Sequence, residues 1–164
     1  MQIRFFSTED TESTADLLHD MSVHYNGSNA SSREAVHSNL VENILGPNSG
    51  VRLVVALDGH RVAGLAAISL LFPAPKERAQ LFMKELYVHS SDRGRGVGER
   101  MMSWLARYAV DNQCVRFDWT VDESNTGALR FYNELGATHV KDKLYFRFAG
   151  AALDALAAED TRDA

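Results

Sequence analysis

The chain carries the stretch Arg93-Gly94-Arg95-Gly96-Val97-Gly98 between a predicted strand, residues 81–88, and a predicted helix, residues 96–110. Three glycines at alternate positions let the backbone turn tightly and approach a ligand closely. The first N–H groups of the following helix are unpaired and carry partial positive charge. Arg93, Arg95 and Arg100 add guanidinium groups that suit phosphate oxygens. The turn therefore predicts a cradle for a phosphate or pyrophosphate group.

Two other phosphate motifs fit this turn less well. A P-loop requires Gly-Lys-Ser/Thr, which is absent here. A dinucleotide-binding fingerprint requires glycine where Glu99 stands. Asp118 has the spacing of that fingerprint's ribose-binding acid, but it falls in the middle of a predicted strand. The remaining alternative is a turn that only connects a strand to a helix.

Apolar periodicity around the turn predicts one layered domain. Alternating or β-rich patterns predict strands at residues 2–6, 51–57, 61–71, 81–88 and 115–121, with one or two more at 138–148. Helical spacing predicts helices at residues 11–25, 96–110 and 126–135, and Ser31 with Glu34 is typical of the start of another that reaches Ile44. We expect an α/β or α+β fold over residues 1–148, followed by an alanine-rich acidic tail over residues 149–164.

Composition and charge argue against several classes of function. The 164 residues have a formal charge of −5, and the tail contributes −3 of it through four acids and one arginine. This balance argues against nucleic-acid binding, which needs clustered Lys and Arg. The single cysteine, Cys114, excludes a disulfide within one chain and favours the cytoplasm. No apolar run suggests a membrane span or a signal peptide, and the scattered histidines predict no metal site.

Two motifs give the chain a family resemblance. Arg93-x-x-Gly96-x-Gly98 is similar to the phosphate motif of the GNAT superfamily of acyl-CoA-dependent N-acetyltransferases, and Glu85-Leu86-Tyr87-Val88 is similar to the strand that precedes it. The stretch Asn125-x-x-Ala128-x-x-Phe131-Tyr132-x-x-x-Gly136 resembles the family's second motif. The resemblance implies a mixed, mostly antiparallel sheet that is split by a V-shaped cleft and flanked by helices.

The resemblance also implies a site for acetyl-CoA. The pantetheine arm would pair with the backbone of Leu86, Tyr87 and Val88, and the pyrophosphate would lie on the turn formed by Arg93, Gly94, Arg95, Gly96, Val97 and Gly98. In the family, the asparagine at the position of Asn125 helps to hold the cofactor. A backbone N–H near Leu86 would stabilise the thioester oxyanion.

Two residues are catalytic candidates by the same resemblance. Tyr132 would protonate the departing thiolate; the alternative is a core tyrosine on an apolar helix face. Glu85 would accept the proton of the amine, through water. Its alternative is an exposed carboxylate paired with Lys84, which replaces an acid found in related diamine acetyltransferases.

The expected reaction is direct acetyl transfer to a primary amine of a small molecule, such as a polyamine or an amino-acid derivative, in a ternary complex of a homodimer. His19, His24 and Tyr25 lie in the region that the family uses to shape its acceptor pocket; the alternative for the histidines is an ordinary surface role. Acids of the two N-terminal helices, including Asp16 and Asp20, are either partners for a cationic amine or solvated charges on the helix faces. A protein N-terminus or lysine as acceptor is one alternative, and a non-enzymatic acyl-CoA-binding regulatory domain is the other.

Overall fold

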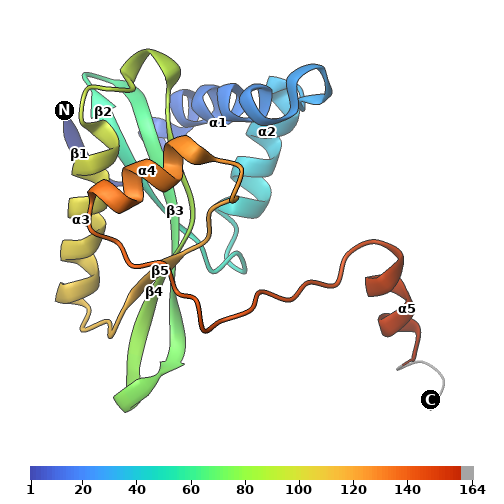
Figure 1. Cartoon of the computed structure of the whole chain (residues 1–164). Helices are drawn as coiled ribbons and strands as arrows, with labels where there is room; N and C mark the ends of the chain where they lie inside the picture. Colours follow the sequence, from blue (N-terminus) through green and yellow to red (C-terminus); the bar gives the residue numbers. More distant parts are fainter. Residues whose placement is uncertain (160–164) are drawn as a thin grey trace. The chain divides into compact units, whose positions relative to one another are not determined.

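The computed structural model of the chain describes residues 1–159, which form two compact units (Figure 1). The first unit comprises residues 1–124 and the second begins at Asn125. The predicted boundary at residue 148 is not tested by this division and stays a prediction. No helix within the described residues is long and apolar enough to cross a membrane.

The first unit is built on a five-stranded sheet whose spatial order follows the sequence. Its strands are β1 (Gln2–Phe5), β2 (Arg52–Asp58), β3 (Arg61–Ala74), β4 (Arg78–Val88) and β5 (Phe117–Trp119). The first four strands run antiparallel to their neighbours, and β5 runs parallel to β4. This arrangement confirms the expected mixed, mostly antiparallel sheet.

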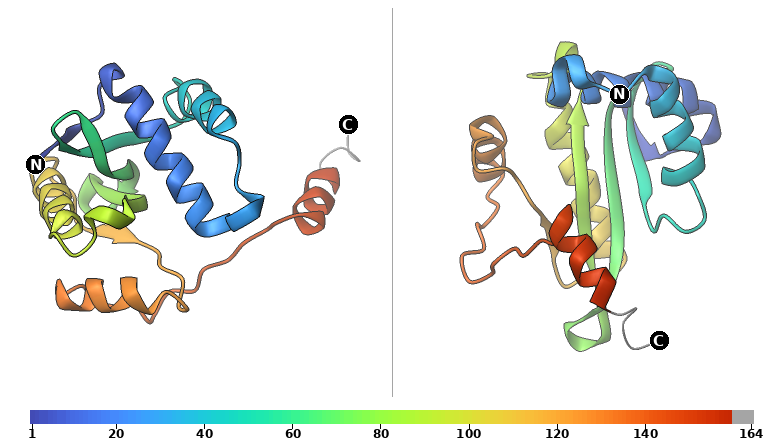
Figure 2. Two further views of the ribbon diagram at one scale, coloured as in Figure 1. Left: turned by 90° about the horizontal axis from the view of Figure 1, so that it is seen from above. Right: turned by 90° about the vertical axis from the view of Figure 1, so that its right-hand side faces the viewer.

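Helices cover both faces of the sheet, α1 and α2 on one side and α3 on the other (Figure 2). The α-helices of this unit are α1 (Thr11–Asn26), α2 (Arg33–Asn39) and α3 (Val97–Asp111). A π-helical turn, Leu40–Ile44, extends α2, and short 3-10 helices occupy Thr8–Asp10, Gly27–Asn29, Pro75–Glu77 and Ser90–Asp92. Because both faces are covered, β2 reads as a continuous apolar run rather than as a strict alternation.

Each face has its own packing. Leu17 and Leu18 of α1 join Leu53, Val55 and Leu65 in one buried cluster. On the opposite face, a Cβ added at Gly64 would lie 3.0 Å from the Sδ of Met101, so glycine at this position lets α3 approach the sheet closely. The sheet is therefore held between two apolar layers, and α3 begins directly at the glycine-rich turn.

Some boundaries differ from the predicted ones. The helix start expected at Ser31 lies one residue later, because the hydroxyl of Ser32 accepts a hydrogen bond from the N–H of Ala35 at 3.2 Å. The fifth strand is shorter than residues 115–121, although Val115 still donates to the carbonyl of Ala79. These shifts leave the order of the elements unchanged.

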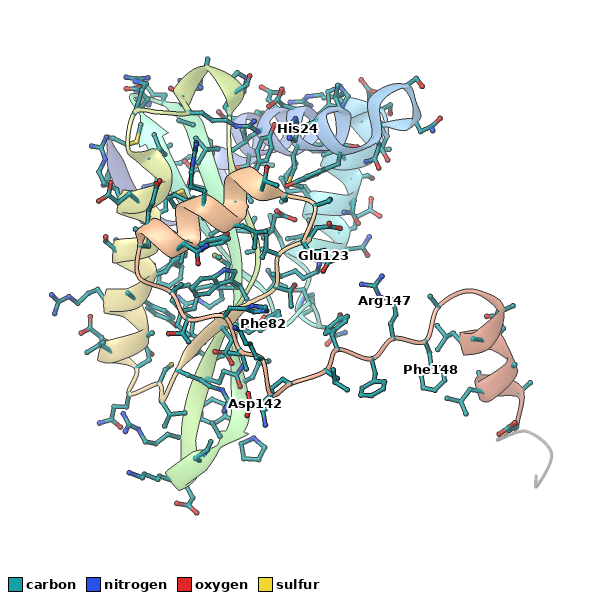
Figure 3. All side chains as sticks on the ribbon, in the orientation of Figure 1. His24, Phe82, Glu123, Asp142, Arg147 and Phe148 are labelled. Carbon is teal, nitrogen blue, oxygen red and sulfur yellow. The ribbon has the colours of Figure 1, made fainter. Side chains whose placement is uncertain are left out.

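The second unit contains α4 (Thr126–Glu134) and α5 (Ala151–Glu159). Gly136, with φ +81°, ends α4 as its position predicted. The prediction of strands at residues 138–148 is wrong, because this segment is extended but forms no strand. Its side chains, including Arg147 and Phe148, stand out from the backbone (Figure 3). A strand also requires hydrogen bonds to a neighbouring strand, and none of the five strands pairs with this segment. Residues 160–164 of the predicted tail lie outside the described residues.

Candidate active site

The fourth and fifth strands part in the middle of β4. Only Leu81, Phe82 and Met83 pair with β5, opposite Phe117–Trp119. From Glu85 to Val88 the strand continues to pair with β3. The second half of β4 therefore has one edge that no strand of the sheet covers. The family resemblance implies a cleft at this separation.

A β-bulge coincides with the point of separation. Met83 pairs with Ile68 and Glu85 pairs with Ala67, so Lys84 is an extra residue in β4. The bulge changes which face the following side chains occupy. Glu85 shares a face with Ala67, which packs against the α1 cluster, whereas Met83 pairs with Ile68 on the α3 face. If Lys84 were paired in a regular ladder, alternation from Met83 would place Glu85 on the α3 face instead.

The backbone of Leu86 and Val88 is directed to the uncovered edge. The N–H of His89 donates to the carbonyl of Ala63 in β3 at 2.9 Å, so alternate residues of β4 bond to β3. The residues between them point the other way. The carbonyl of Val88 confirms this direction, because it accepts a hydrogen bond from Nε of Arg93 at 3.1 Å. An extended ligand can therefore pair with this edge as an additional strand would.

Glu85 lies beside a cluster of aromatic residues. Burial raises the pKa of its carboxyl above the ordinary value, and the Lys84 ammonium and the Leu86 N–H oppose that shift. Burial raises the pKa of Tyr25 as well, and the negative charge of Glu85 adds to that effect. Glu85 is half-buried whereas Lys84 is exposed. This environment favours the uncharged carboxyl more than a surface position does.

The side chain of Tyr87 was not anticipated from the sequence, which assigned only its backbone to the site. Its hydroxyl donates to Oδ2 of Asp20 at 2.8 Å, and its ring lies 5.8 Å from His24 and 6.3 Å from Tyr25. Burial, followed by the hydrogen bond to Asp20, raises the pKa of Tyr87 to about 12. The C-terminal half of α1, including His24 (Figure 3), thus joins β4 around Glu85.

The glycine-rich turn has the backbone that the sequence predicted. Gly94 and Gly96 both have φ +73°, a conformation that L side chains rarely adopt, and Gly96 directly precedes α3. Arg93 lies over the ring of Tyr87 at 5.3 Å. Arg100 donates to the carbonyl of Arg95 at 3.0 Å. The glycine-rich turn therefore leads directly into the first turn of α3, whose first N–H groups have no partner within the helix.

Asp92 organises this turn and was missed from the sequence. Its side chain is only 1% exposed and lies 2.6 Å from Nη1 of Arg95 and 2.8 Å from Nη1 of Arg61. The Arg61 guanidinium holds the pKa of Asp92 below its ordinary value. Arg95, predicted as a phosphate ligand, thus holds the loop to a buried acid. In the sequence, Asp92 is only an acid directly before the turn, and this pattern does not distinguish a buried acid from an exposed loop acid.

Asn125 and Tyr132 belong to the second unit. Oδ1 of Asn125 accepts a hydrogen bond from the N–H of Ala128 at 3.0 Å and caps α4. Tyr132 follows on α4, with its ring 5.1 Å from that of Phe131. Their roles at the cofactor and the leaving thiolate stay predictions. Within residues 1–159, no three His, Cys, Asp or Glu side chains are grouped as metal ligands.

Comparison with known proteins agrees with this geometry. The model of the acetyltransferase (GNAT) family matches residues 15–137. An integron cassette protein from the mobile metagenome of V. cholerae is 33% identical, with a TM-score of 0.91 over 95% of this chain and 96% of that one.

Two curated enzymes are similar over about half of the chain. An L-ornithine N5-acetyltransferase of Arabidopsis thaliana is 26% identical over 58% of this chain and 42% of its own length. A thialysine N-epsilon-acetyltransferase of Sus scrofa is 32% identical over 47% of each chain. The chain therefore spans about half the length of these enzymes.

We predict that Asp92→Asn destabilises the protein in a pH-dependent manner. The change removes a carboxylate bonded to two arginines, and hydrogen bonds to charged groups contribute about 2 kcal/mol each. Since the folded-state pKa of Asp92 is lowered, its stabilisation is complete above the unfolded pKa of about 4 and is lost as the pH falls through the folded value. Urea unfolding at pH 7 and at successively lower pH measures the difference.

Asp111→Asn, an exposed change at the end of α3, is the control and should alter stability by less than about 0.5 kcal/mol. An equal loss in both variants, or a loss from Asp92→Asn that does not shrink below pH 4, would contradict the role assigned to Asp92.

Proposed function

The chain belongs to the acetyltransferase (GNAT) family, and from this premise we propose that it transfers the acetyl group of acetyl-CoA to a primary amine of a small molecule. The amine attacks the thioester directly while both substrates are bound. The observation that carries this proposal is the uncovered edge of β4, with Glu85 on its α1 face and the glycine-rich turn at its end. Family membership sets aside the non-enzymatic alternative.

The cofactor is held mainly by backbone in this proposal. The pantetheine arm pairs along Leu86, Tyr87 and Val88, where β5 has separated from β4. The pyrophosphate lies at the N-terminus of α3 on the turn from Arg93 to Gly98, where a helix end favours negative charge. Asp92 fixes the conformation of this turn through its contact with Arg95. Asn125, at the start of α4, helps to hold the cofactor.

The reaction requires an amine that has lost its proton. A free alkylamine has a pKa of about 10, so deprotonation at pH 7 costs about 4 kcal/mol. Glu85 accepts this proton through water. Because its pKa is raised, its carboxylate binds a proton more tightly at neutral pH than an ordinary carboxylate does, as a general base there requires. The N–H of Leu86 donates to the developing oxyanion, and Tyr132 protonates the departing thiolate.

The acceptor is a small molecule in this proposal. The ring of Tyr25, which is 56% exposed and near enough to Glu85 to feel its charge, offers a face of the kind that binds alkylammonium groups. The curated relatives support the same class, because their names specify ornithine and thialysine, both of which are small amines.

We predict that the wild-type protein releases thiol from acetyl-CoA with members of a panel of small amines and that Glu85→Gln lowers kcat by about 10²-fold. In the wild type, kcat falls as the pH drops through the raised pKa of Glu85, because the protonated carboxyl accepts no proton. The variant loses this acidic limb. Stopped assays of thiol release across pH measure both effects.

The matched control is Glu77→Gln, which changes an exposed carboxyl in the turn between β3 and β4. It should leave the rate and the pH profile unchanged. Thiol release that occurs only with peptides, or a Glu85→Gln variant with the wild-type profile, would overturn the acceptor or the base, respectively.

Replacing Tyr132 by Phe should lower kcat by about 10²-fold while the KM for acetyl-CoA stays the same, because the phenol acts only on the leaving thiolate. Tyr145→Phe, which removes an exposed hydroxyl from the same unit, is the control. A Tyr132→Phe enzyme with undiminished turnover would show that another group protonates the thiolate.

We also propose that the protein is a homodimer of the cytoplasm. The chain has a single cysteine, and low cysteine content without a disulfide framework suits a reducing compartment. The support for a dimer is the extended segment 138–148, which exposes large apolar side chains, namely Val140, Leu144, Tyr145, Phe146 and Phe148. Phe146 is 84% exposed. Large apolar side chains exposed together in one short segment favour an interface, and a second copy of the same chain would cover them.

Light scattering during gel filtration should give twice the chain mass of 18.2 kDa for the wild type and the chain mass for Phe146→Asp. A charge on that side chain is costly to bury in an apolar interface. Arg147→Gln, a change to the next exposed residue, should stay dimeric. A wild type that elutes as a monomer, or a Phe146→Asp variant that is still a dimer, would exclude this interface.

A further inference from the structure

The side chain of Tyr87 contacts structural elements on two sides of the proposed reaction centre. It is 3% exposed and lies two residues beyond Glu85 on the same face of β4. Its ring is 5.8 Å from that of His24 (Figure 3) and 6.3 Å from that of Tyr25, both at the end of α1. The guanidinium of Arg93 lies over the same ring at 5.3 Å. One buried side chain therefore meets both the end of α1 and the glycine-rich turn.

The end of α1 is held to the sheet by the hydroxyl of Tyr87. The packing of α1 on the buried apolar cluster ends at Met21, and residues 22–26 are all partly or largely exposed. Just before this point, Oδ2 of Asp20 accepts a hydrogen bond from the Tyr87 hydroxyl at 2.8 Å. Near the other end of the helix, the hydroxyl of Ser13 accepts from a backbone N–H of β3 at 2.8 Å. The helix is thus hydrogen-bonded to the sheet near both of its ends.

The position of Tyr25 depends on this hydrogen bond. Tyr25 lies five residues after Asp20, in the last turn of the helix, and helix ends fray unless they are tied down. Nε2 of His89 lies 3.9 Å from the same carboxylate oxygen, beyond hydrogen-bond distance, so it does not replace the phenol. Without the Tyr87 hydroxyl, the ring of Tyr25 would have a less defined position beside Glu85.

A direct role for Tyr87 in proton transfer fits the structure less well. Its proton is directed to Asp20 rather than to the uncovered edge of β4. Burial, followed by the hydrogen bond to Asp20, raises the pKa of Tyr87 to about 12, so the phenol is a weaker acid than an ordinary tyrosine. The contribution of Tyr87 is therefore made through the groups that it holds.

Arg93 is the second of these groups. Its Nε donates to the carbonyl of Val88 at 3.1 Å, and its guanidinium lies over the Tyr87 ring. A cation is attracted to the face of an aromatic ring. The ring and the carbonyl therefore hold the first residue of the glycine-rich turn beside the uncovered edge of β4. This contact uses the ring alone, whereas the contact with α1 uses the hydroxyl.

We propose that Tyr87 is a positioning residue for both substrates of the acetyl transfer. Its hydroxyl holds the end of α1, so that Tyr25 stays at the acceptor site. Its ring orients Arg93 for the cofactor. This role rests on the proposed function and adds a residue that acts in the same site through its neighbours.

Tyr87→Phe removes the hydroxyl and keeps the ring. We expect the KM for the amine to rise about 10-fold, because a hydrogen bond to a charged group is lost, while kcat and the KM for acetyl-CoA change less than about 3-fold. The acceptor is the amine with the highest kcat/KM in a panel that includes ornithine and thialysine. Asp20 is 35% exposed, so water can bond its carboxylate in the variant. Circular dichroism checks that the variant is folded.

Tyr87→Leu removes the ring as well. The KM for acetyl-CoA should then rise about 3-fold in addition, because Arg93 loses its aromatic partner. This difference between the two variants separates the contribution of the ring from that of the hydroxyl. An equal KM for acetyl-CoA in both variants would overturn the role of the ring.

Changes at Asp20 test the hydroxyl from the other side of the bond. Asp20→Ala should match Tyr87→Phe, and the double variant should be no worse than either, because all three lack the same hydrogen bond. Asp20→Asn keeps an oxygen that accepts from the phenol and should stay within about 3-fold of the wild type. Tyr108→Phe, which removes a hydroxyl that accepts from Arg52, is the matched control and should leave both KM values unchanged.

Hydrogen–deuterium exchange gives a readout that needs no turnover. In Tyr87→Phe, amides of residues 22–26 should exchange faster, while those of β2 and α3 stay at the wild-type rate. This local change in a protein that acetylates no amine would support the positioning of α1 and contradict the proposed function. Wild-type exchange at residues 22–26, faster exchange throughout the first unit, or turnover with an unchanged KM for the amine would overturn the role of the hydroxyl and leave the proposed function standing.

Discussion

The separation of β4 from β5 after Met83 is the constraint on which the site depends. Backbone N–H and C=O groups inside a sheet are normally paired, and unpaired ones require water or a ligand. Along Leu86 and Val88 such groups have no strand partner at the middle of the sheet, and side chains take that place: Arg93 donates to the Val88 carbonyl, and the Leu86 N–H is bonded to the Glu85 carboxyl. An extended cofactor can pair there without displacing a strand.

The bulge at Lys84 determines which side chains lie beside this edge. It directs Glu85 and Tyr87 to the face covered by α1, so a half-buried carboxyl, three aromatic rings and Asp20 gather beside the exposed backbone. At the end of the same strand, buried Asp92 ties Arg61 and Arg95 together and shapes the anion-binding turn. One strand therefore positions both the proposed cofactor contacts and the proposed base.

The sequence predicted what local patterns determine. The apolar runs of β2 and β3 and the glycine-rich turn before α3 appear where expected. The bulge at Lys84 was not predictable, because it depends on the register with β3, which no local signal encodes. The partners of Tyr87 and Asp92 were missed for a related reason: they come from distant segments, Asp20 and Arg61. Segment 138–148 has a strand-like composition but pairs with none of the five strands. Its local pattern alone therefore gave a wrong prediction.

The most direct measurement of this account is hydrogen–deuterium exchange of individual amides with and without CoA. If the pantetheine arm pairs with the uncovered edge of β4, exchange at Leu86 and Val88 slows when CoA is added, together with exchange at the turn that precedes α3. The amide of Tyr87, which faces β3, should change little. Unchanged exchange at Leu86 and Val88 under conditions where CoA is bound would contradict the central claim.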